Sequence, residues 1–226
     1  RHVGDGDLSC RTNLPPGSSL ARVGRTFDQR ATQLQAMIAS RKQLTDAIAH
    51  ELRTPLNSIL GFTDVLLRRG VEKVFAIDVG HEQMVEQLFE HPKVICVEGF
   101  NARELSPETL SERTGIPQSH INIDLVVGDL SFISLTLVLA QMLSVAPRAD
   151  FVLLVKPQFE VGKQSLSAHG LVNDHNLRAG AIKQVADEAA KLGMGIRGLE
   201  RSELPGTHGN VEYVLWISPN EPVNQS

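Results

Sequence analysis

The spacing of apolar residues changes at Gly70, and this change divides the sequence into two parts that must fold differently. Between residues 20 and 67, apolar side chains recur every three or four positions, which predicts a helix with one apolar stripe. A stripe of about 50 residues is long for a globular helix and is typical of a coiled coil. Pro55 interrupts the stripe and predicts a kink there, because proline lacks the backbone N–H that the helix needs.

Beyond Gly70, short apolar runs alternate with helical patterns. The runs indicate strands and lie at residues 71–78, 94–97, 121–127, 151–155 and 211–217. The helical patterns between them lie at residues 81–90, 135–143 and 176–192. Strands that alternate with helices are typical of a mostly parallel α/β sheet. We therefore predict an α/β fold preceded by a long, coiled-coil-like N-terminal helix.

The composition limits the classes of partner. The chain has 226 residues, of which 42% are apolar and 4% aromatic, so its core must consist largely of aliphatic side chains. The net charge of −4 argues against a dedicated nucleic-acid surface, because such surfaces cluster Lys and Arg against phosphates. A local basic patch is compatible with this charge.

The cysteines and the ends of the chain bear on its location. Cys10 and Cys96 lack the spacing of metal ligands, so we expect no metal site and no disulfide framework. This cysteine usage favours the reducing cytoplasm. No apolar run reaches the ~18 residues that a membrane span needs. Because the first residue is Arg1, we expect the sequence to begin inside a longer protein.

Residues 49–56 form an unbroken motif, Ala-His-Glu-Leu-Arg-Thr-Pro-Leu. This motif resembles the phosphoacceptor box of sensor histidine kinases, and residues 6–8 and 20–34 resemble part of a HAMP signal-relay module. The resemblance implies a dimeric helical hairpin in which His50 accepts the phosphate and Glu51 helps to activate it. A neutral imidazole nitrogen can attack a γ-phosphate near physiological pH. The alternative interpretation is an ordinary histidine on a helix surface.

The resemblance to histidine kinases ends near Leu60. The family's second hairpin helix and its ATP-binding domain have no counterpart after that residue. We therefore expect that ATP acts on this segment only through a partner kinase domain, and that His50 is phosphorylated only in trans. The apolar stripe also predicts a homodimer through the N-terminal helix, because a single exposed helix would leave the stripe in water.

Four motifs in the second part of the chain carry another resemblance. They are Gly-Phe-Thr-Asp-Val-Leu-Leu at residues 61–67, Asp-Leu-Val-Val-Gly-Asp-Leu-Ser-Phe-Ile-Ser at 124–134, Leu-Val-Lys-Pro-Gln-Phe-Glu at 154–160 and Gly-Asn-Val-Glu-Tyr at 209–213. Together they resemble the haemolysin-A-type rRNA methyltransferases, relatives of the FtsJ 2′-O-methyltransferases. The resemblance implies a Rossmann-like sheet, S-adenosylmethionine as cofactor and rRNA as partner.

That family methylates a ribose 2′-hydroxyl with a Lys-Asp-Lys-Glu tetrad. By motif, Asp129, Lys156 and Glu212 occupy the last three places, so the resemblance implies that they are catalytic. A lysine among carboxylates suits this chemistry, because it can orient a hydroxyl or help to deprotonate it. The alternatives are a helix cap for Asp129, an ordinary strand-end charge for Lys156 and an edge-strand charge for Glu212.

The resemblance also implies a cofactor site. Gly61 is what remains of the family's glycine-rich loop, and Asp129 lies on the cofactor side as well as in the tetrad. Asp78 follows a predicted strand, where an acid can accept hydrogen bonds from a cofactor ribose. Asn101 matches the next cofactor-side position, and its alternative interpretation is a simple turn residue.

Several parts of that family's domain have no counterpart in this sequence. A strand ending in Asp-Val-Gly and a loop of small residues precede Gly61 in the family, whereas residues 53–60 here read Arg-Thr-Pro-Leu-Asn-Ser-Ile-Leu. Ile59 and Leu60 would prevent the close backbone approach that glycine permits. The first tetrad lysine and the RNA-binding N-terminal module are also missing. The lost strand is central in the family, so its absence predicts unpaired edges on both sides.

These observations give a domain plan and three hypotheses for function. The plan is a HAMP-like connector at residues 1–19, a phosphoacceptor-like helix at 20–60, a truncated Rossmann-like methyltransferase domain at 61–218 and a tail at 219–226. The main hypothesis is an rRNA 2′-O-methyltransferase domain that binds S-adenosylmethionine weakly or not at all and is inactive as it stands. The alternatives are a two-component signalling module phosphorylated in trans, and an artificial or misassembled chimera without selected function.

Overall fold

The computed structural model describes residues 28–30, 32–33, 35–36, 58–82, 84–167, 169–206 and 209–219. The chain divides into two units, residues 1–47 and residues 48–226. The described residues of the first unit are helical, and the Thr32 hydroxyl donates to the Asp28 carbonyl at 2.9 Å. Several predicted features lie outside the described residues. They are the connector, the kink at Pro55, the phosphoacceptor residues His50 and Glu51, and residues 220–226 of the tail.

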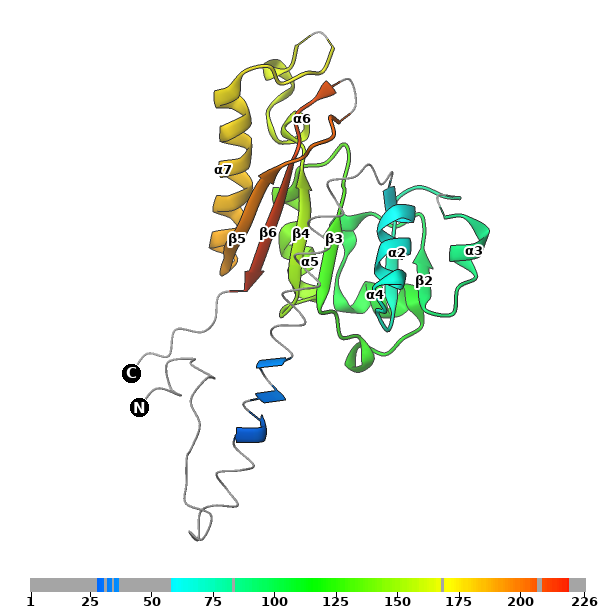
Figure 1. The fold of residues 1–226 in the computed structure, drawn as a ribbon. Coiled ribbons are helices and arrows are strands. Elements are labelled where there is room, and N and C mark those ends of the chain that lie inside the picture. Colours follow the sequence, from blue (N-terminus) through cyan, green and yellow to red (C-terminus); the bar gives the residue numbers. More distant parts are fainter. Residues whose placement is uncertain are drawn as a thin grey trace, which may run out of the picture. The chain divides into compact units, whose positions relative to one another are not determined.

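The described part of the second unit contains two separate β-sheets (Figure 1). The first pairs β1 with β2 in parallel, and these strands span Val74–Ile77 and Val94–Val97. The second has the strand order β3-β4-β6-β5, with the bounds Leu125–Gly128, Asp150–Val155, Tyr213–Pro219 and Met194–Arg201 in that order. β3 and β4 are parallel, whereas β6 is antiparallel to both β4 and β5. The prediction of a mostly parallel sheet therefore holds for β1 to β4 and is wrong for β5 and β6.

Helices connect the strands. The α-helices are α2 Ser58–Arg68, α3 Glu86–Phe89, α4 Pro107–Thr114, α5 Leu139–Val145, α6 Pro157–Glu160 and α7 His175–Lys191. Short 3₁₀ turns are η2 Ala102–Glu104, η3 Gln118–His120, η4 Leu135–Leu137 and η5 Lys163–Ser165. Local sequence signals fix both ends of α4. Ser106 and Thr109 form a capping box before this helix, and Gly115 ends it with a φ of 70°.

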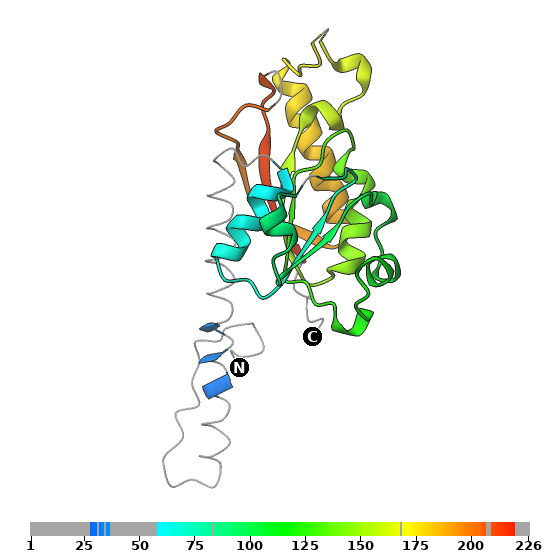
Figure 2. The same cartoon turned by 90° about the vertical axis from the view of Figure 1, so that its right-hand side faces the viewer.

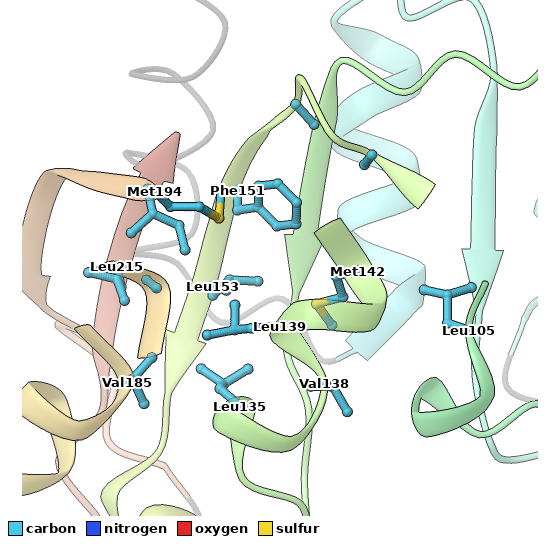
Figure 3. Close-up of a cluster of buried hydrophobic side chains, with 14 of the residues drawn as sticks. Leu105, Leu135, Val138, Leu139, Met142, Phe151, Leu153, Val185, Met194 and Leu215 are labelled. Atoms are coloured by element: carbon cyan, nitrogen blue, oxygen red, sulfur yellow. The ribbon is translucent and has the colours of Figure 1, made fainter. Parts of the chain in front are cut away.

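Two apolar clusters pack against the strands, the larger one mainly on the four-stranded sheet and the smaller one on β1 and β2. The larger cluster joins β4 and β6 to α4, α5 and α7, and Figure 3 shows its central side chains, including Phe151, Leu153 and Leu139. Figures 1 and 2 show α7 running alongside β5. The smaller cluster packs Leu66 and Leu67 of α2 onto Val74 of β1. Burial on both sides explains why β4 reads as a continuous apolar run instead of an alternating one.

β1 and β3 do not pair with each other, so each ends its sheet. Among the described strands, β1 pairs only with β2, and β3 pairs only with β4. Phe75 and Ile77 of β1 nevertheless pack against the same cluster as Val126 of β3. The two sheets therefore share one apolar core.

Candidate active site

Asp129 and Lys156 meet at one edge of the larger sheet. They follow β3 and β4, which are parallel neighbours, so the carboxyl ends of these strands lie together. Lys156 Nζ lies 2.7 Å from Asp129 Oδ1, and the two side chains are only 13% and 19% exposed. Lys156 also donates to the Ser131 hydroxyl at 2.9 Å. These two partners therefore hold the Lys156 side chain in one orientation.

Glu212 reaches the same edge from a third strand. Tyr213 at the start of β6 pairs with Val155, which brings the preceding residue, Glu212, opposite Lys156. Glu212 is 6% exposed, and its Oε1 accepts a hydrogen bond from Gln158 Nε2 at 3.1 Å. Burial raises the pKa of the Glu212 carboxyl, and the Gln158 hydrogen bond and the Lys156 charge partly oppose this shift. A carboxyl group of this kind can hold or release a proton beside the lysine.

Gly206 leaves the room that the Glu212 carboxylate occupies. A Cβ built on Gly206 would overlap the carboxylate, and the Gly206 N–H donates to the Asn210 carbonyl at 2.8 Å. The loop between β5 and β6 is therefore shaped around this acid. The sequence did not predict the roles of Gln158 and Gly206, because these roles depend on contacts between segments that are distant in the sequence.

Glu160 anchors the loop that follows β3. One oxygen of its buried carboxyl accepts from the Leu135 N–H at 2.9 Å, and the other accepts from the Ser134 hydroxyl at 2.5 Å. Burial raises the pKa of Glu160, while these two hydrogen bonds partly lower it. The loop is thus fastened at Ser131 by Lys156 and at Ser134 by Glu160. Glu160 belonged to a recognised motif, but its anchoring role was not predicted.

Phe132 lies between these two anchor points and points into solvent. Its side chain is 92% exposed and its φ is 64°, a conformation that is costly for a bulky residue. The ring lies 5.2 Å from the Phe159 ring, centroid to centroid, with the planes tilted by 48°. An exposed ring, Phe132, packed on the half-buried ring of Phe159, therefore flanks the three charged side chains.

Of the predicted cofactor residues, Asp129 lies at the larger sheet with Lys156, whereas Asp78, Asn101 and Gly61 lie at the smaller sheet. Asp78 and Asn101 follow β1 and β2, and the Phe100 N–H donates to the Asp78 carbonyl at 3.0 Å. The Asp78 carboxylate accepts from the Gly80 N–H at 2.7 Å, and the Asn101 side chain accepts from the Arg103 N–H at 3.0 Å. Both side chains thus accept hydrogen bonds within their own turns. Gly61 lies in α2, the helix that packs on β1.

The described part of the chain offers neither a membrane-spanning helix nor a metal site. No helix there is long and apolar enough to cross a membrane, and no group of three His, Cys, Asp or Glu side chains could hold a metal ion. Cys96 in β2 is a free, half-buried thiol whose pKa is raised, first by burial and then by the charges of Glu98 and Asp78. A raised pKa disfavours the reactive thiolate.

The profile of FtsJ-like methyltransferases matches residues 61–218. The chain belongs to this family. A relative from Mycobacterium tuberculosis, the 16S/23S rRNA (cytidine-2'-O)-methyltransferase TlyA, is 48% identical over 158 residues, which cover 70% of this chain and 56% of that protein. A crystal structure of "a putative hemolysin" from Lactococcus lactis superposes with a TM-score of 0.66 at 28% identity, covering 78% of this chain and 85% of that one. The chain thus spans little more than half the length of its Mycobacterium relative.

A short N-terminal segment has a different relative. The sensor protein RstB of Escherichia coli is 57% identical over 56 residues, which are 25% of this chain and 13% of that protein. The resemblance of the first part of the chain to histidine kinases is therefore confirmed. Two unrelated families are joined in one sequence, and the FtsJ-like part is the larger.

Proposed function

We propose that residues 61–218 are the catalytic domain of an rRNA ribose 2′-O-methyltransferase that is inactive as it stands. The observation that supports this function is the meeting of Asp129, Lys156 and Glu212, which come from three different strands. The charges lie at the carboxyl edge of a parallel strand pair, where α/β folds bind their ligands. A protein that methylates rRNA works in the cytoplasm, which is where we place this chain.

The chemistry assigned to the site rests on a fixed lysine. Because Asp129 and Ser131 fix the Lys156 ammonium group, it can donate a hydrogen bond to a ribose 2′-oxygen and orient that oxygen for attack. Glu212, whose burial favours its protonated form, can exchange a proton in the same place. S-adenosylmethionine would supply the methyl group.

Phe132 suits the recognition of a nucleotide. Proteins hold unstacked RNA bases against exposed aromatic rings, and such stacking contributes about 1–3 kcal/mol per base. The Phe132 ring is held next to Phe159 and lies three residues after Asp129, so a base stacked on it would bring its ribose toward Lys156. This arrangement needs no extensive basic surface and is compatible with the net charge of −4.

The described residues fit only part of the cofactor. Asp78 and Asn101 lie side by side at the carboxyl ends of β1 and β2, where a ribose and a base could bind. No described strand pairs with β1 on the side away from β2, and residues 58–60 belong to α2 instead of a glycine-rich loop. Half of the cofactor therefore has no wall among the described residues, which supports weak or absent binding.

Replacing residues 1–60 with the corresponding segment of the Mycobacterium relative tests this function. We expect the unaltered chain to transfer no methyl group from labelled S-adenosylmethionine to rRNA, and the replaced chain to do so. Lys156→Ala in the replaced chain should lower the rate by about a hundredfold or more, because it removes a preorganised donor. Lys183→Ala, in an exposed ion pair on α7, is the matched control and should change little. Transfer that survives Lys156→Ala would refute the assigned role.

We propose a second function for the N-terminal segment, as a homodimeric phosphoacceptor module of two-component signalling. The identity to RstB is the observation that favours it. His50 would accept phosphate, with Glu51 assisting, and ATP would act only through a kinase domain supplied by another chain. The third hypothesis, an artificial chimera, predicts that no intact genomic reading frame spans residues 57–64.

The phosphoacceptor proposal predicts labelling of His50 in trans only. Incubation with radiolabelled ATP alone should give no acid-labile phosphate, whereas a separately purified RstB catalytic domain with ATP should give it. His50→Ala should abolish the label, and His175→Ala, at the start of α7, is the control that should retain it. Label that appears without the added kinase domain would contradict the proposal.

A further inference from the structure

The Gln158 side chain is enclosed next to the candidate active site. It belongs to α6, two residues after Lys156, and is 9% exposed. Its Nε2 donates to Glu212 Oε1 at 3.1 Å. The other polar atom of the amide, Oε1, is buried and has no hydrogen-bond partner among the residues that the structure describes. The contact that engages this amide is therefore the one with Glu212.

A half-paired amide is an unfavourable way to fill a buried position. Burying a polar group without a partner costs free energy, whereas an apolar side chain of the same shape avoids this cost. Methionine is close to glutamine in length and would fill the space without an unpaired oxygen. Packing alone therefore does not explain Gln158, and its contact with Glu212 does.

The same oxygen of Glu212 is enclosed from a second direction. A Cβ built on Gly206 would overlap Glu212 Oε1, so the loop between β5 and β6 leaves room for this atom. Gln158 and Gly206 thus fix one oxygen of the carboxyl group, and Oε2 is the oxygen that remains to exchange a proton. Fixing one oxygen sets the orientation of the whole carboxyl group next to Lys156.

Burial and neighbouring groups act on Glu212 in opposite directions. Burial raises the pKa of its carboxyl group, and the Asp129 charge also raises it. The Gln158 hydrogen bond and the Lys156 charge lower this pKa. The other acid of α6, Glu160, is bonded to the loop after β3 instead. Gln158 is thus the uncharged neighbour that favours the ionised form of Glu212.

We propose that Gln158 is a positioning residue that orients the Glu212 carboxyl group and favours its ionised form next to Lys156. The proposal rests on the function proposed above, in which Glu212 exchanges a proton beside a ribose 2′-oxygen. Gln158 acts only through Glu212. By opposing the effect of burial, it lowers the pH at which this acid is able to accept a proton.

Titration of Glu212 in the full chain tests the proposal without any methyl transfer. Glutamate is labelled with ¹³C at the side-chain carboxyl carbon, and the signal of Glu212 is the one that is missing from the NMR spectrum of Glu212→Gln. We expect Gln158→Met to raise the pKa of Glu212 by about one unit or more, the effect of losing a hydrogen bond to a charged acceptor. Gln141→Met on α5 is the matched control, because Gln141 Oε1 is also buried without a partner among the described residues. This control should leave the pKa of Glu212 unchanged.

Urea unfolding separates positioning from a merely structural role. Because methionine removes the unpaired oxygen, the urea midpoint of Gln158→Met should not fall below that of the unaltered chain. A lower midpoint together with an unchanged pKa of Glu212 would show a structural role and overturn the proposal. Equal shifts of this pKa in Gln158→Met and Gln141→Met would overturn it as well.

Gln158→Glu keeps the size of the side chain and serves if the methionine variant does not fold. Two adjacent carboxyl groups oppose each other's ionisation, so one of the pair should titrate well above Glu212 of the unaltered chain. Titration of both groups at the ordinary value of an exposed glutamate would overturn the proposal.

Methyl transfer gives a separate readout in the chain whose residues 1–60 are replaced. There, Gln158→Met should move the pH midpoint of the transfer rate upward by the same amount as the pKa of Glu212. A midpoint that stays in place while the pKa of Glu212 moves would overturn the proposal. Absence of transfer in the replaced chain would refute the proposed function instead, and the titration of Glu212 would still decide the role of Gln158.

Discussion

The purified chain is expected to bind S-adenosylmethionine about a hundredfold or more weakly than the version whose residues 1–60 are replaced. Two losses act on the same ligand. Residues 58–60 are the first turn of α2, so no glycine loop offers its N–H groups to the charged methionine end. Losing two hydrogen bonds to a charged group costs about 3 kcal/mol, which is about a hundredfold in Kd.

The pairing of β1 weakens the site further. Asp78 lies at the end of β1, and β2 is the one described strand that pairs with β1, so no described strand faces Asp78 on its other side. Titration calorimetry of both proteins with S-adenosylmethionine measures the difference, and Asp78→Asn in the replaced chain reports whether that carboxylate holds the ribose. A low-micromolar Kd for the unaltered chain would contradict the expectation and would mean that residues preceding α2 rebuild a cofactor loop.

The sequence predicted β2 and β4 to within one residue of their observed starts, and both strands are continuous apolar runs except for Asp150. β2 spans the predicted residues 94–97, and β4 begins one residue before the predicted range 151–155. Short continuous apolar runs of this kind are typical of buried strands. β5 was missed, because only one of its residues is fully buried and two glycines and three charges interrupt its apolar pattern. Its strand form depends on pairing with β6, which a local pattern does not report.

The sequence identified the charged residues of the candidate site but not their arrangement in space. The motifs singled out Asp129, Lys156 and Glu212, and the register of three strands brings them together. The supporting contacts of Gln158 and Gly206 arise only because β6 lies next to β4 across more than 50 residues of sequence. Such long-range contacts produce no periodic pattern in the sequence.

The core around β4 should be unusually sensitive to loss of packing. Phe151 lies in β4, the inner strand next to β3, and is 0% exposed. Figure 3 shows its ring beside Met194, with Leu153 of the same strand pointing into the same cluster. Among the described strands, β3 pairs only with β4, so the cluster behind β4 must supply much of the stability.

Phe151→Ala is therefore expected to lower the free energy of unfolding by about 3–5 kcal/mol, from lost burial and from the cavity left behind. Since whole domains are stable by only about 5–15 kcal/mol, this loss removes a large share of the stability. Leu199→Ala on β5, where the side chain is 43% exposed, is the matched control and should cost less than about 1 kcal/mol. Urea unfolding followed by circular dichroism measures both variants. A loss below about 1 kcal/mol for Phe151→Ala would mean that β4 is not the centre of the stable core.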